Sequence, residues 1–201
     1  MARLAVRGAV ALAIALSVAF FAGRCGLPEP AVLPAAAYAG EDGQGGEETA
    51  VLAGGCFWGI EAVFEHVKGV IDVVSGYAGG SVRDPSYELV TTGATGHAEA
   101  VRITFDPSQV SYGELLRVFF SVAHDPTQLN RQGPDVGTQY RSAIFTHSPE
   151  QERLAREAAA RAAERLGRPV ATQIVPAETF WPAEEYHQQY LVKNGRATCA
   201  I

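Results

Sequence analysis

The sequence contains very little of the sulfur-bearing amino acids. Methionine occurs only at position 1, and cysteine occurs at Cys25, Cys56 and Cys199 among 201 residues. The 5 histidines have no spacing to these cysteines that is typical of metal ligands. We therefore expect no zinc site.

The sequence also lacks a basic cluster. It has 16 Lys and Arg residues against 22 Asp and Glu residues, which gives a formal net charge of −6 and a pI near 5.4. We therefore expect no nucleic-acid partner. A phosphate-binding glycine motif and a dinucleotide fingerprint are absent as well. With 47% hydrophobic and 19% charged residues, the composition is that of a folded globular protein.

Residues 1–39 predict a signal peptide or N-terminal membrane-targeting segment. Arg3 and Arg7 precede an uncharged, mostly apolar run at 9–23, which is as long as a signal-peptide core and short for a membrane span. An Ala-x-Ala pattern before Gly40 would release a chain that begins there. We therefore expect an exported protein, periplasmic or secreted, or one anchored to the membrane by an uncleaved leader.

Cys25 raises the alternative of a lipid anchor, but Arg24 occupies the position where a lipoprotein signal needs a small residue. Beyond the leader, residues 40–47 are polar and rich in glycine, as in a flexible linker. We expect residues 48–201 to form one domain, which keeps two of the cysteines. In an exported protein these two form either a structural disulfide or a pair that opens and closes in a redox cycle.

Apolar periodicity and turn residues divide this domain into short helices and strands. A long polar segment at 124–139 is expected to be a functional loop, and 193–201 an extended tail. Because helices and strands mix without strict βαβ alternation, we expect an α+β domain with a mainly antiparallel or mixed sheet and helices packed on it. Alternating charges along the helix predicted at 148–166 indicate that one of its faces is exposed to solvent. The pattern predicts strands at 49–53, 69–77, 97–105, 140–146 and 172–175, and helices at 60–67, 86–92, 111–122, 148–166 and 184–192.

The stretch from Gly54 to Gly59 is the clearest candidate site. Gly54 and Gly55 allow a sharp turn from the preceding strand into a helix, so Cys56 would lie in the first turn of that helix. Free N–H groups and the positive end of the helix dipole stabilise an anion there, which predicts a lowered pKa for the Cys56 thiol. The alternative is a buried structural cysteine.

Four polar side chains elsewhere could assist a nucleophile. Glu99 lies in an apolar-leaning strand, where burial without a cation would raise its pKa and suit it to donate a proton near neutral pH. The spacing alone favours the opposite interpretation, a carboxylate on the solvent face. Tyr87 and Tyr140 offer phenolic donors, or are half-buried packing residues. Asp135 could orient water or a hydroxyl, or is a turn residue after Pro134.

Two other functional classes stay open on these residues alone. His97 or His187 could serve as the base of a Cys/His hydrolase whose nucleophile is Cys56. A disulfide between Cys56 and Cys199 could instead staple a domain without enzymatic activity.

Six short strings follow one another along the domain: GCFWG at 55–59, GYAGG at 76–80, GHAEAV at 96–101, DPT at 125–127, RQGPDVGTQYRS at 131–142 and AEEYHQQYL at 183–191. Together they resemble the peptide methionine sulfoxide reductases of the A type. The resemblance covers about residues 48–199, and an ordered set of strings is far more specific than any one of them.

The resemblance implies a ferredoxin-like two-layer α+β sandwich and no metal or organic cofactor. It implies an oxidoreductase that reduces the S epimer of methionine sulfoxide, free or in oxidised proteins, and so repairs oxidative damage. Matched motif by motif, Cys56 would attack the sulfoxide sulfur and Glu99 would donate a proton to the sulfoxide oxygen. Tyr87 and Tyr140 would assist the proton donor, and Asp135 would support the polar network.

The resemblance also assigns substrate recognition and recycling. Phe57 and Trp58 would form the apolar pocket for the terminal methyl group of the substrate. Cys199 falls where the family often carries its first resolving cysteine, and would condense with a sulfenic acid on Cys56 to a redox-active disulfide. A thioredoxin-like external dithiol would then restore the thiols, and we expect the protein to be a monomer.

Three departures from the family pattern affect mainly this recycling. Pro134 stands where the family usually has asparagine, and stiffens the segment that carries Asp135. The usual Gly-Tyr before the resolving cysteine is replaced by Ala and Thr at 197–198. The chain ends at Ile201, without the second cysteine that many relatives carry in a glycine-rich tail.

Overall fold

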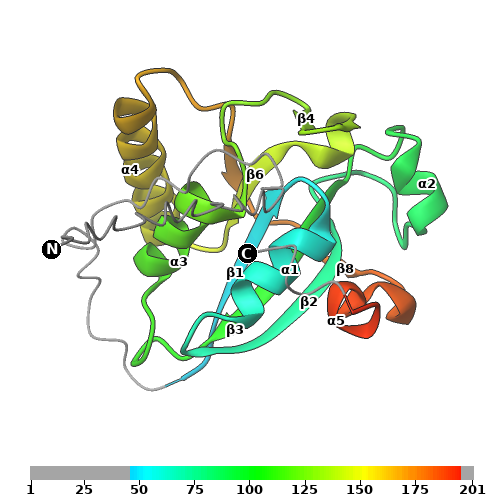
Figure 1. Ribbon diagram of the computed structural model, residues 1–201, viewed down its shortest axis with the longest axis horizontal. Coiled ribbons are helices and arrows are strands. Elements are labelled where there is room, and N and C mark those ends of the chain that lie inside the picture. Colours follow the sequence, from blue (N-terminus) through cyan, green and yellow to red (C-terminus); the bar gives the residue numbers. More distant parts are fainter. Residues whose placement is uncertain (1–45, 196–201) are drawn as a thin grey trace, which may run out of the picture.

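The computed structural model describes residues 46–195, and Figure 1 shows their arrangement. Within this range no helix is long and apolar enough to cross a membrane. The predicted leader, most of the predicted linker and the end of the predicted tail lie outside the described residues.

A six-stranded sheet forms the centre of the domain, in the order β7-β6-β1-β3-β2-β8. Neighbouring strands are antiparallel except β6 and β7, which are parallel. The order and connections of the four inner strands are those of a ferredoxin-like fold. The predicted α+β class with a mainly antiparallel sheet is therefore confirmed. The strands are β1 (Glu48–Gly54), β2 (Val70–Ala78), β3 (Ala98–Phe105), β6 (Ser142–Thr146), β7 (Gln173–Pro176) and β8 (Trp181–Pro182).

Three helices, α1, α3 and α4, cover one face of this sheet (Figure 1). Helix α3 continues into a π-helical turn, η2 (Phe119–Ala123), and two short 3₁₀ turns, η3 (Thr138–Tyr140) and η4 (Glu185–His187), follow further along the chain. The helices are α1 (Phe57–Glu65), α2 (Tyr87–Thr91), α3 (Tyr112–Val118), α4 (Pro149–Leu166) and α5 (Tyr190–Lys193).

Side chains along the inner strands alternate between the two faces of the sheet. On the helix face, Leu52, Ile103 and Ile144 belong to one large buried cluster with residues of α1, α3 and α4. A smaller cluster on the opposite face includes Val51 and Phe145, and is covered by Phe180 and its neighbours from the β7–β8 connection. The position of a residue along its strand therefore decides whether it points toward the helices.

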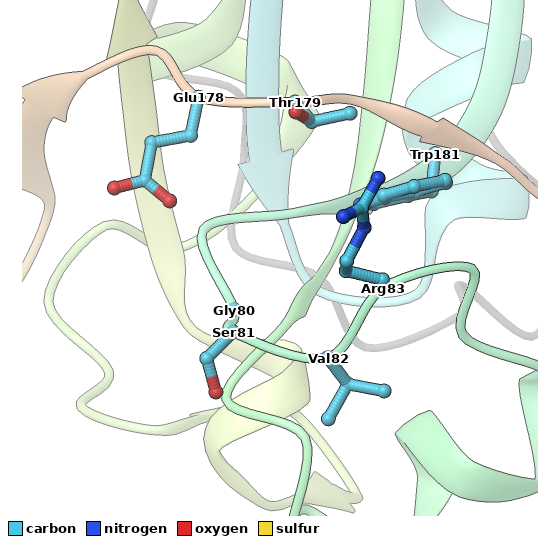
Figure 2. Close-up of a pocket in the computed structure, with 7 residues that line it drawn as sticks. All are labelled: Gly80, Ser81, Val82, Arg83, Glu178, Thr179 and Trp181. Atoms are coloured by element: carbon cyan, nitrogen blue, oxygen red, sulfur yellow. The ribbon is translucent and has the colours of Figure 1, made fainter.

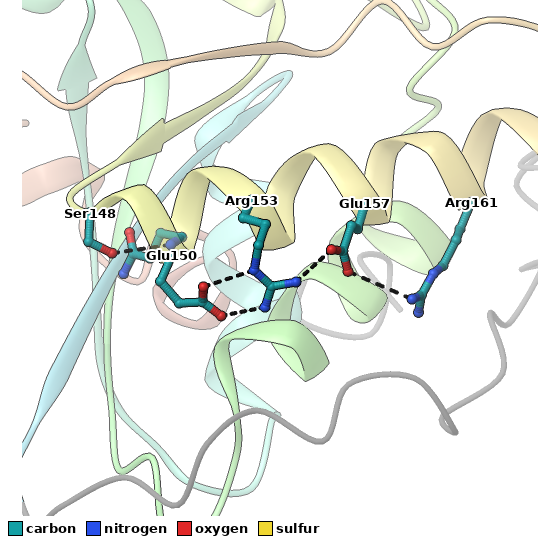
Figure 3. Close-up of polar contacts among 6 residues, drawn as sticks. Ser148, Glu150, Arg153, Glu157 and Arg161 are labelled. Carbon is teal, nitrogen blue, oxygen red and sulfur yellow. Dashed lines mark hydrogen bonds and ion pairs between the residues drawn. The ribbon is translucent and has the colours of Figure 1, made fainter.

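Helix α4 has the charged outer face that its sequence predicts (Figure 3). The Ser148 hydroxyl accepts a hydrogen bond from the Gln151 amide at 3.1 Å and so caps the helix. The helix has an exposed face with ion pairs and a buried face made of alanines. Because exposed ion pairs contribute little to stability, the packing of the buried alanines is what holds α4 on the sheet. The exposed face carries a chain of ion pairs formed by Glu150, Arg153, Glu157 and Arg161. The buried face consists of Ala155, Ala158, Ala159 and Ala162.

Two segments differ from their predicted structure. The polar segment 124–139 is not a featureless loop, because it contains the hairpin β4 (Arg131–Gln132) and β5 (Asp135–Val136) and the start of η3. The helix predicted at 184–192 is wrong, since the chain forms η4, then a left-handed turn with φ +52° at Gln189, then α5. The physical reason is Gln188, whose side chain pairs with the backbone of Ser75 in β2 instead of projecting from a helix.

Candidate active site

Cys56 occupies the turn between β1 and α1, as predicted, and is the N-cap residue of α1. The turn requires glycine at position 55, where φ is +105° and a Cβ atom would lie 2.7 Å from the Gln132 side chain. The Cys56 thiol is half-buried and free of any disulfide in the described part of the chain. The start of α1 therefore presents a single accessible thiol.

The predicted lowering of the Cys56 pKa is wrong for this site at rest. Burial, followed by the charge of Glu99, raises the pKa of Cys56 to about 12. The backbone amides of Trp58 and Gly59 do lower this pKa, as expected at a helix start, while the charge of Asp135 raises it further. Lost solvation and two nearby carboxylates outweigh the two amides. Cys56 is therefore a neutral thiol in the resting protein.

Glu99 lies on the helix face of β3, opposite Tyr77 in β2. Its side chain is 1% exposed, so the solvent-facing carboxylate that the strand spacing favoured is wrong. Glu99 Oε2 accepts a hydrogen bond from the Phe57 backbone amide at 3.0 Å, which holds the carboxyl beside the start of α1. Burial raises the pKa of Glu99 to about 7, although the Phe57 amide lowers it, and Asp135 adds a further rise. A protonated Glu99 is therefore available near neutral pH.

Two half-buried phenols come from separate elements to the same place. Tyr87 begins α2 and Tyr140 ends η3. Burial, and then the charge of Glu99, raise the pKa of Tyr140 to about 12, and the same two causes raise the pKa of Tyr87. Cys56 and Asp135 act on both phenols as well. The five predicted polar residues thus form one cluster, and both phenols keep their protons at neutral pH.

Phe57 and Trp58 form an aromatic wall next to Cys56. The Phe57 ring is buried and lies 6.4 Å from the Tyr87 ring, nearly parallel to it. The Trp58 ring is half-buried and stacks on Tyr190, with 3.7 Å between ring centroids and 10° between the planes. Trp58 also donates its indole N–H to His187 Nδ1 at 3.1 Å. The two rings are held rigidly beside the thiol.

Sequence reasoning missed the part played by Tyr77 and Glu184. The Tyr77 hydroxyl donates to Glu184 Oε2 at 2.8 Å, and Glu184 Oε1 accepts from the Tyr87 backbone amide at 2.9 Å. Glu184 thereby ties β2 to the start of α2 and orients Tyr87. The strand pattern contained a signal for this contact. Tyr77 lies four residues after the buried Val73, so its side chain points to the same face of the sheet, and a buried tyrosine hydroxyl needs a hydrogen-bond partner.

Neither histidine proposed for a hydrolase is hydrogen-bonded to Cys56. His97 accepts from the Gly80 amide at 3.1 Å through Nδ1 and contacts the Val82 carbonyl at 2.8 Å through Nε2, so both ring nitrogens serve the β2–α2 connection. His187 Nδ1 is used by Trp58. Among the described residues, no group of three His, Cys, Asp or Glu side chains could hold a metal ion. Cys199 lies outside the described residues, so its predicted pairing stays a prediction.

A groove of about 380 Å³ lies between the β2–α2 connection and the segment from the β7–β8 connection into β8 (Figure 2). The exposed polar side chains that line it are those of Ser81, Arg83, Glu178 and Thr179. None of the predicted site residues lines it. The groove is therefore separate from the reactive cluster.

The cluster defines a class of protein before any relative is considered. A neutral thiol, a buried carboxylic acid with its pKa near neutrality and two protonated phenols suit nucleophilic attack on a centre whose oxygen must be protonated before it leaves. An apolar wall beside the thiol suits a substrate with an apolar end. These are the requirements of a cysteine-dependent enzyme that removes an oxygen atom.

Known proteins fit this class. A sequence profile of the family described as "Peptide methionine sulfoxide reductase" matches residues 48–201. The peptide methionine sulfoxide reductase MsrA of Acidobacterium capsulatum is 56% identical over 154 residues, which are 76% of this chain and 98% of the relative. The solved methionine sulfoxide reductase A of Corynebacterium diphtheriae has a TM-score of 0.71 and 40% identity, covering 84% of this chain and 83% of that one. Mxr1 from Saccharomyces cerevisiae in complex with Trx2 has a TM-score of 0.52 and 27% identity, covering 72% of this chain and 84% of that one.

The chain belongs to the peptide methionine sulfoxide reductase family, in its A type. The predicted activity, thiol-dependent reduction of methionine S-sulfoxide to methionine, is confirmed by this membership.

Proposed function

We propose that Cys56 is the nucleophile of this reductase and that Glu99 is its proton donor. The observation that carries the proposal is the Glu99 carboxyl, which is buried beside the start of α1 and has its pKa raised to about 7. A sulfoxide oxygen is a poor leaving group unless it is protonated, and a neutral carboxylic acid at this place supplies the proton.

Glu99 and Cys56 supply both protons that move in the chemical step. Glu99 donates its proton to the sulfoxide oxygen, while the Cys56 sulfur forms a bond to the sulfoxide sulfur. The thiol proton of Cys56 passes to the carboxylate that Glu99 has become, which the raised pKa of Glu99 favours. The raised pKa of Cys56 opposes this transfer until the sulfur has bonded to the substrate, because that bond makes the thiol proton acidic. The S–O bond of the substrate then breaks as the protonated oxygen bonds to the Cys56 sulfur. The new S–S bond breaks with its electron pair on the substrate sulfur, so that methionine leaves and Cys56 carries the oxygen as a sulfenic acid.

Tyr87 and Tyr140 hold the substrate oxygen in this scheme. Both phenols are protonated at neutral pH and can donate hydrogen bonds to an oxygen that gains negative charge in the transition state. Asp135 faces the same cluster and orders its polar network. Phe57 and Trp58 receive the terminal methyl group, since they form the apolar wall beside the thiol. No metal or organic cofactor has a role in the scheme.

Recycling of Cys56 is proposed to use Cys199. The thiol of Cys199 condenses with the Cys56 sulfenic acid, which forms a disulfide and releases water. An external dithiol then reduces the disulfide and is itself oxidised. The complex of Mxr1 with Trx2 supports a thioredoxin-like protein as that dithiol. The scheme needs a single chain.

Without reductant, one turnover is expected to convert Cys56 and Cys199 into an intramolecular disulfide. Incubation with methionine sulfoxide should yield about one methionine per chain and remove both free thiols. Mass spectrometry of the digested protein would identify the linked peptides. In the matched variant Cys199→Ser, the expected product is a sulfenic acid on Cys56 that dimedone traps. A stable sulfenic acid in the wild-type chain would contradict the role of Cys199.

We also propose that residues 1–39 export the enzyme, which places its dithiol partner outside the cytoplasm. Expressed with its leader in a Gram-negative host, the chain is expected in the periplasm with Gly40 as its first residue, or in the membrane with the leader retained. Fractionation and N-terminal sequencing distinguish the two. A chain of residues 40–201 is the control and should stay in the cytoplasm. A full-length chain in the cytoplasm would contradict export.

A further inference from the structure

We propose that Glu61 is a positioning residue, which holds the C-terminal strap in place so that Trp58 keeps the geometry of the substrate wall. The C-terminal strap is the segment 183–195. The inference rests on the proposed function of Trp58, and it gives a task to a buried acid that the chemistry above does not use.

Glu61 is an unusual residue for its place in the fold. It lies on α1 three residues after Trp58, on the same side of the helix. Its side chain is 1% exposed, and Oε1 has no hydrogen-bond partner among the described residues. Burying a carboxyl in this way is costly, and such a group is retained where its interactions have a use.

The interactions of Glu61 lead to the strap. Burial raises the pKa of Glu61, while the nearby backbone amides of Gln189 and Tyr190 and the Ser75 hydroxyl lower it by favouring the charged carboxylate. Gln189 has a φ of +52°, a left-handed backbone conformation that residues other than glycine rarely adopt. Gln189 is thus both the left-handed residue of the strap and a residue whose amide affects the Glu61 carboxyl.

The strap in turn holds the Trp58 ring on two sides. Tyr190 stacks on the face of the indole at 3.7 Å, and His187 accepts the indole N–H at 3.1 Å. Gln188, between them, is fixed to β2 because its side chain accepts from the Ser75 amide at 2.9 Å and donates to the Ser75 carbonyl at 3.0 Å. Residues 187–190 are thus fixed to the sheet at Gln188, and α5, which begins at Tyr190, packs against α1. Glu61 is the buried acid of α1 whose carboxyl lies near the stacked tyrosine.

Replacing Glu61 with glutamine removes the ionisable carboxyl and keeps the side-chain volume. In single-turnover reactions without reductant, we expect the half-saturating sulfoxide concentration to rise about fivefold while the maximal rate stays within about twofold, since a loosened wall weakens binding of substrate and transition state alike. In a Trp181→Phe background, which leaves Trp58 as the one tryptophan, the emission maximum should move to longer wavelength as the Tyr190 stack loosens. Glu164→Gln, on the exposed face of α4, is the matched control and should change neither quantity.

A second variant tests the same path without altering Glu61. Tyr190→Ala removes the stack directly and should raise the half-saturating concentration by a similar factor. If Glu61 acts through the strap, the double variant Glu61→Gln/Tyr190→Ala should be no worse than Tyr190→Ala alone. Additive effects, an unchanged half-saturating concentration in Glu61→Gln, or an equal effect of Glu164→Gln would each overturn the proposal. Failure of the proposed chemistry would appear separately, as absence of methionine formation in the unaltered chain.

Discussion

Replacing Cys56 with serine is expected to abolish methionine formation from the S-sulfoxide. A serine hydroxyl is a far weaker nucleophile toward sulfur, and it can form neither a sulfenic acid nor a disulfide. The loss should be at least about 10⁴-fold, the scale seen when an enzyme loses its nucleophile. The measurement is methionine release from separated sulfoxide epimers by the full chain with excess dithiol. The R epimer, which the wild-type enzyme should not reduce, provides the background.

Cys199→Ser is the matched control for this experiment, because it removes a cysteine and leaves the nucleophile. It should still release about one methionine per chain in the first turnover. Sustained turnover by Cys56→Ser would disprove the assignment of the nucleophile. Two measurements address the other functional classes. An acyl-enzyme formed from an ester substrate would favour a Cys/His hydrolase, and a melting temperature lowered by reductant would favour a structural disulfide.

The fold could be predicted to a large extent because most of its helices and strands are marked by patterns within a few neighbouring residues. Apolar alternation in the strands and capping residues such as Ser111 and Ser148 mark the same elements in the sequence and in the structure. The prediction of one helix at 184–192 is wrong, although the segment has the residue spacing that is typical of a helix. The helix is interrupted at Gln188, because its side chain is hydrogen-bonded to the backbone of Ser75 in β2, more than a hundred residues earlier in the chain.

The residues of the site could be named from the sequence, but their electrostatics could not. The glycine turn at Cys56 predicts a lowered pKa, and the two amides that lower it are present. The larger effects, burial and the charge of Glu99, come from residues brought together only by the fold. For Glu99 the spacing alone favours the solvent face, since the strand alternates and both of its neighbours are alanines. Only the fold, in which α1, α3 and α4 cover one face of the sheet, places Glu99 on the buried side.

Glu99→Gln is expected to slow the single-turnover formation of methionine by about 10²–10⁴-fold, the usual contribution of a positioned proton donor. Glutamine keeps the shape and can still accept the Phe57 amide, but it has no acidic proton. The same change should make Cys56 more acidic, because the charge of Glu99 raises the pKa of the thiol. Alkylation of Cys56 at neutral pH should therefore become faster while sulfoxide reduction becomes slower. A variant that merely disturbs the fold would not separate these two rates in opposite directions.

Tyr87→Phe and Tyr140→Phe serve as graded controls for the Glu99 variant. Each removes one hydrogen-bond donor to the substrate oxygen and leaves the proton donor, so each should slow the same step by less than Glu99→Gln does. If either phenylalanine variant were slower than Glu99→Gln, a phenol rather than the carboxyl would be the principal donor.

The pH dependence of the wild-type enzyme tests the proton path directly. Glu99 has a pKa raised to about 7, so its donor form prevails below that pH and is lost as the pH rises through it. Cys56 keeps its proton over the same range, since its pKa is raised to about 12. If both protons are present in the reacting state, the single-turnover rate should be level below pH 7 and fall about tenfold for each pH unit above it. The residual rate of Glu99→Gln should not show this fall. A wild-type rate that stays level from pH 7 to pH 9 would mean that one proton suffices, and that Cys56 reacts as a thiolate formed by transfer of its proton to Glu99.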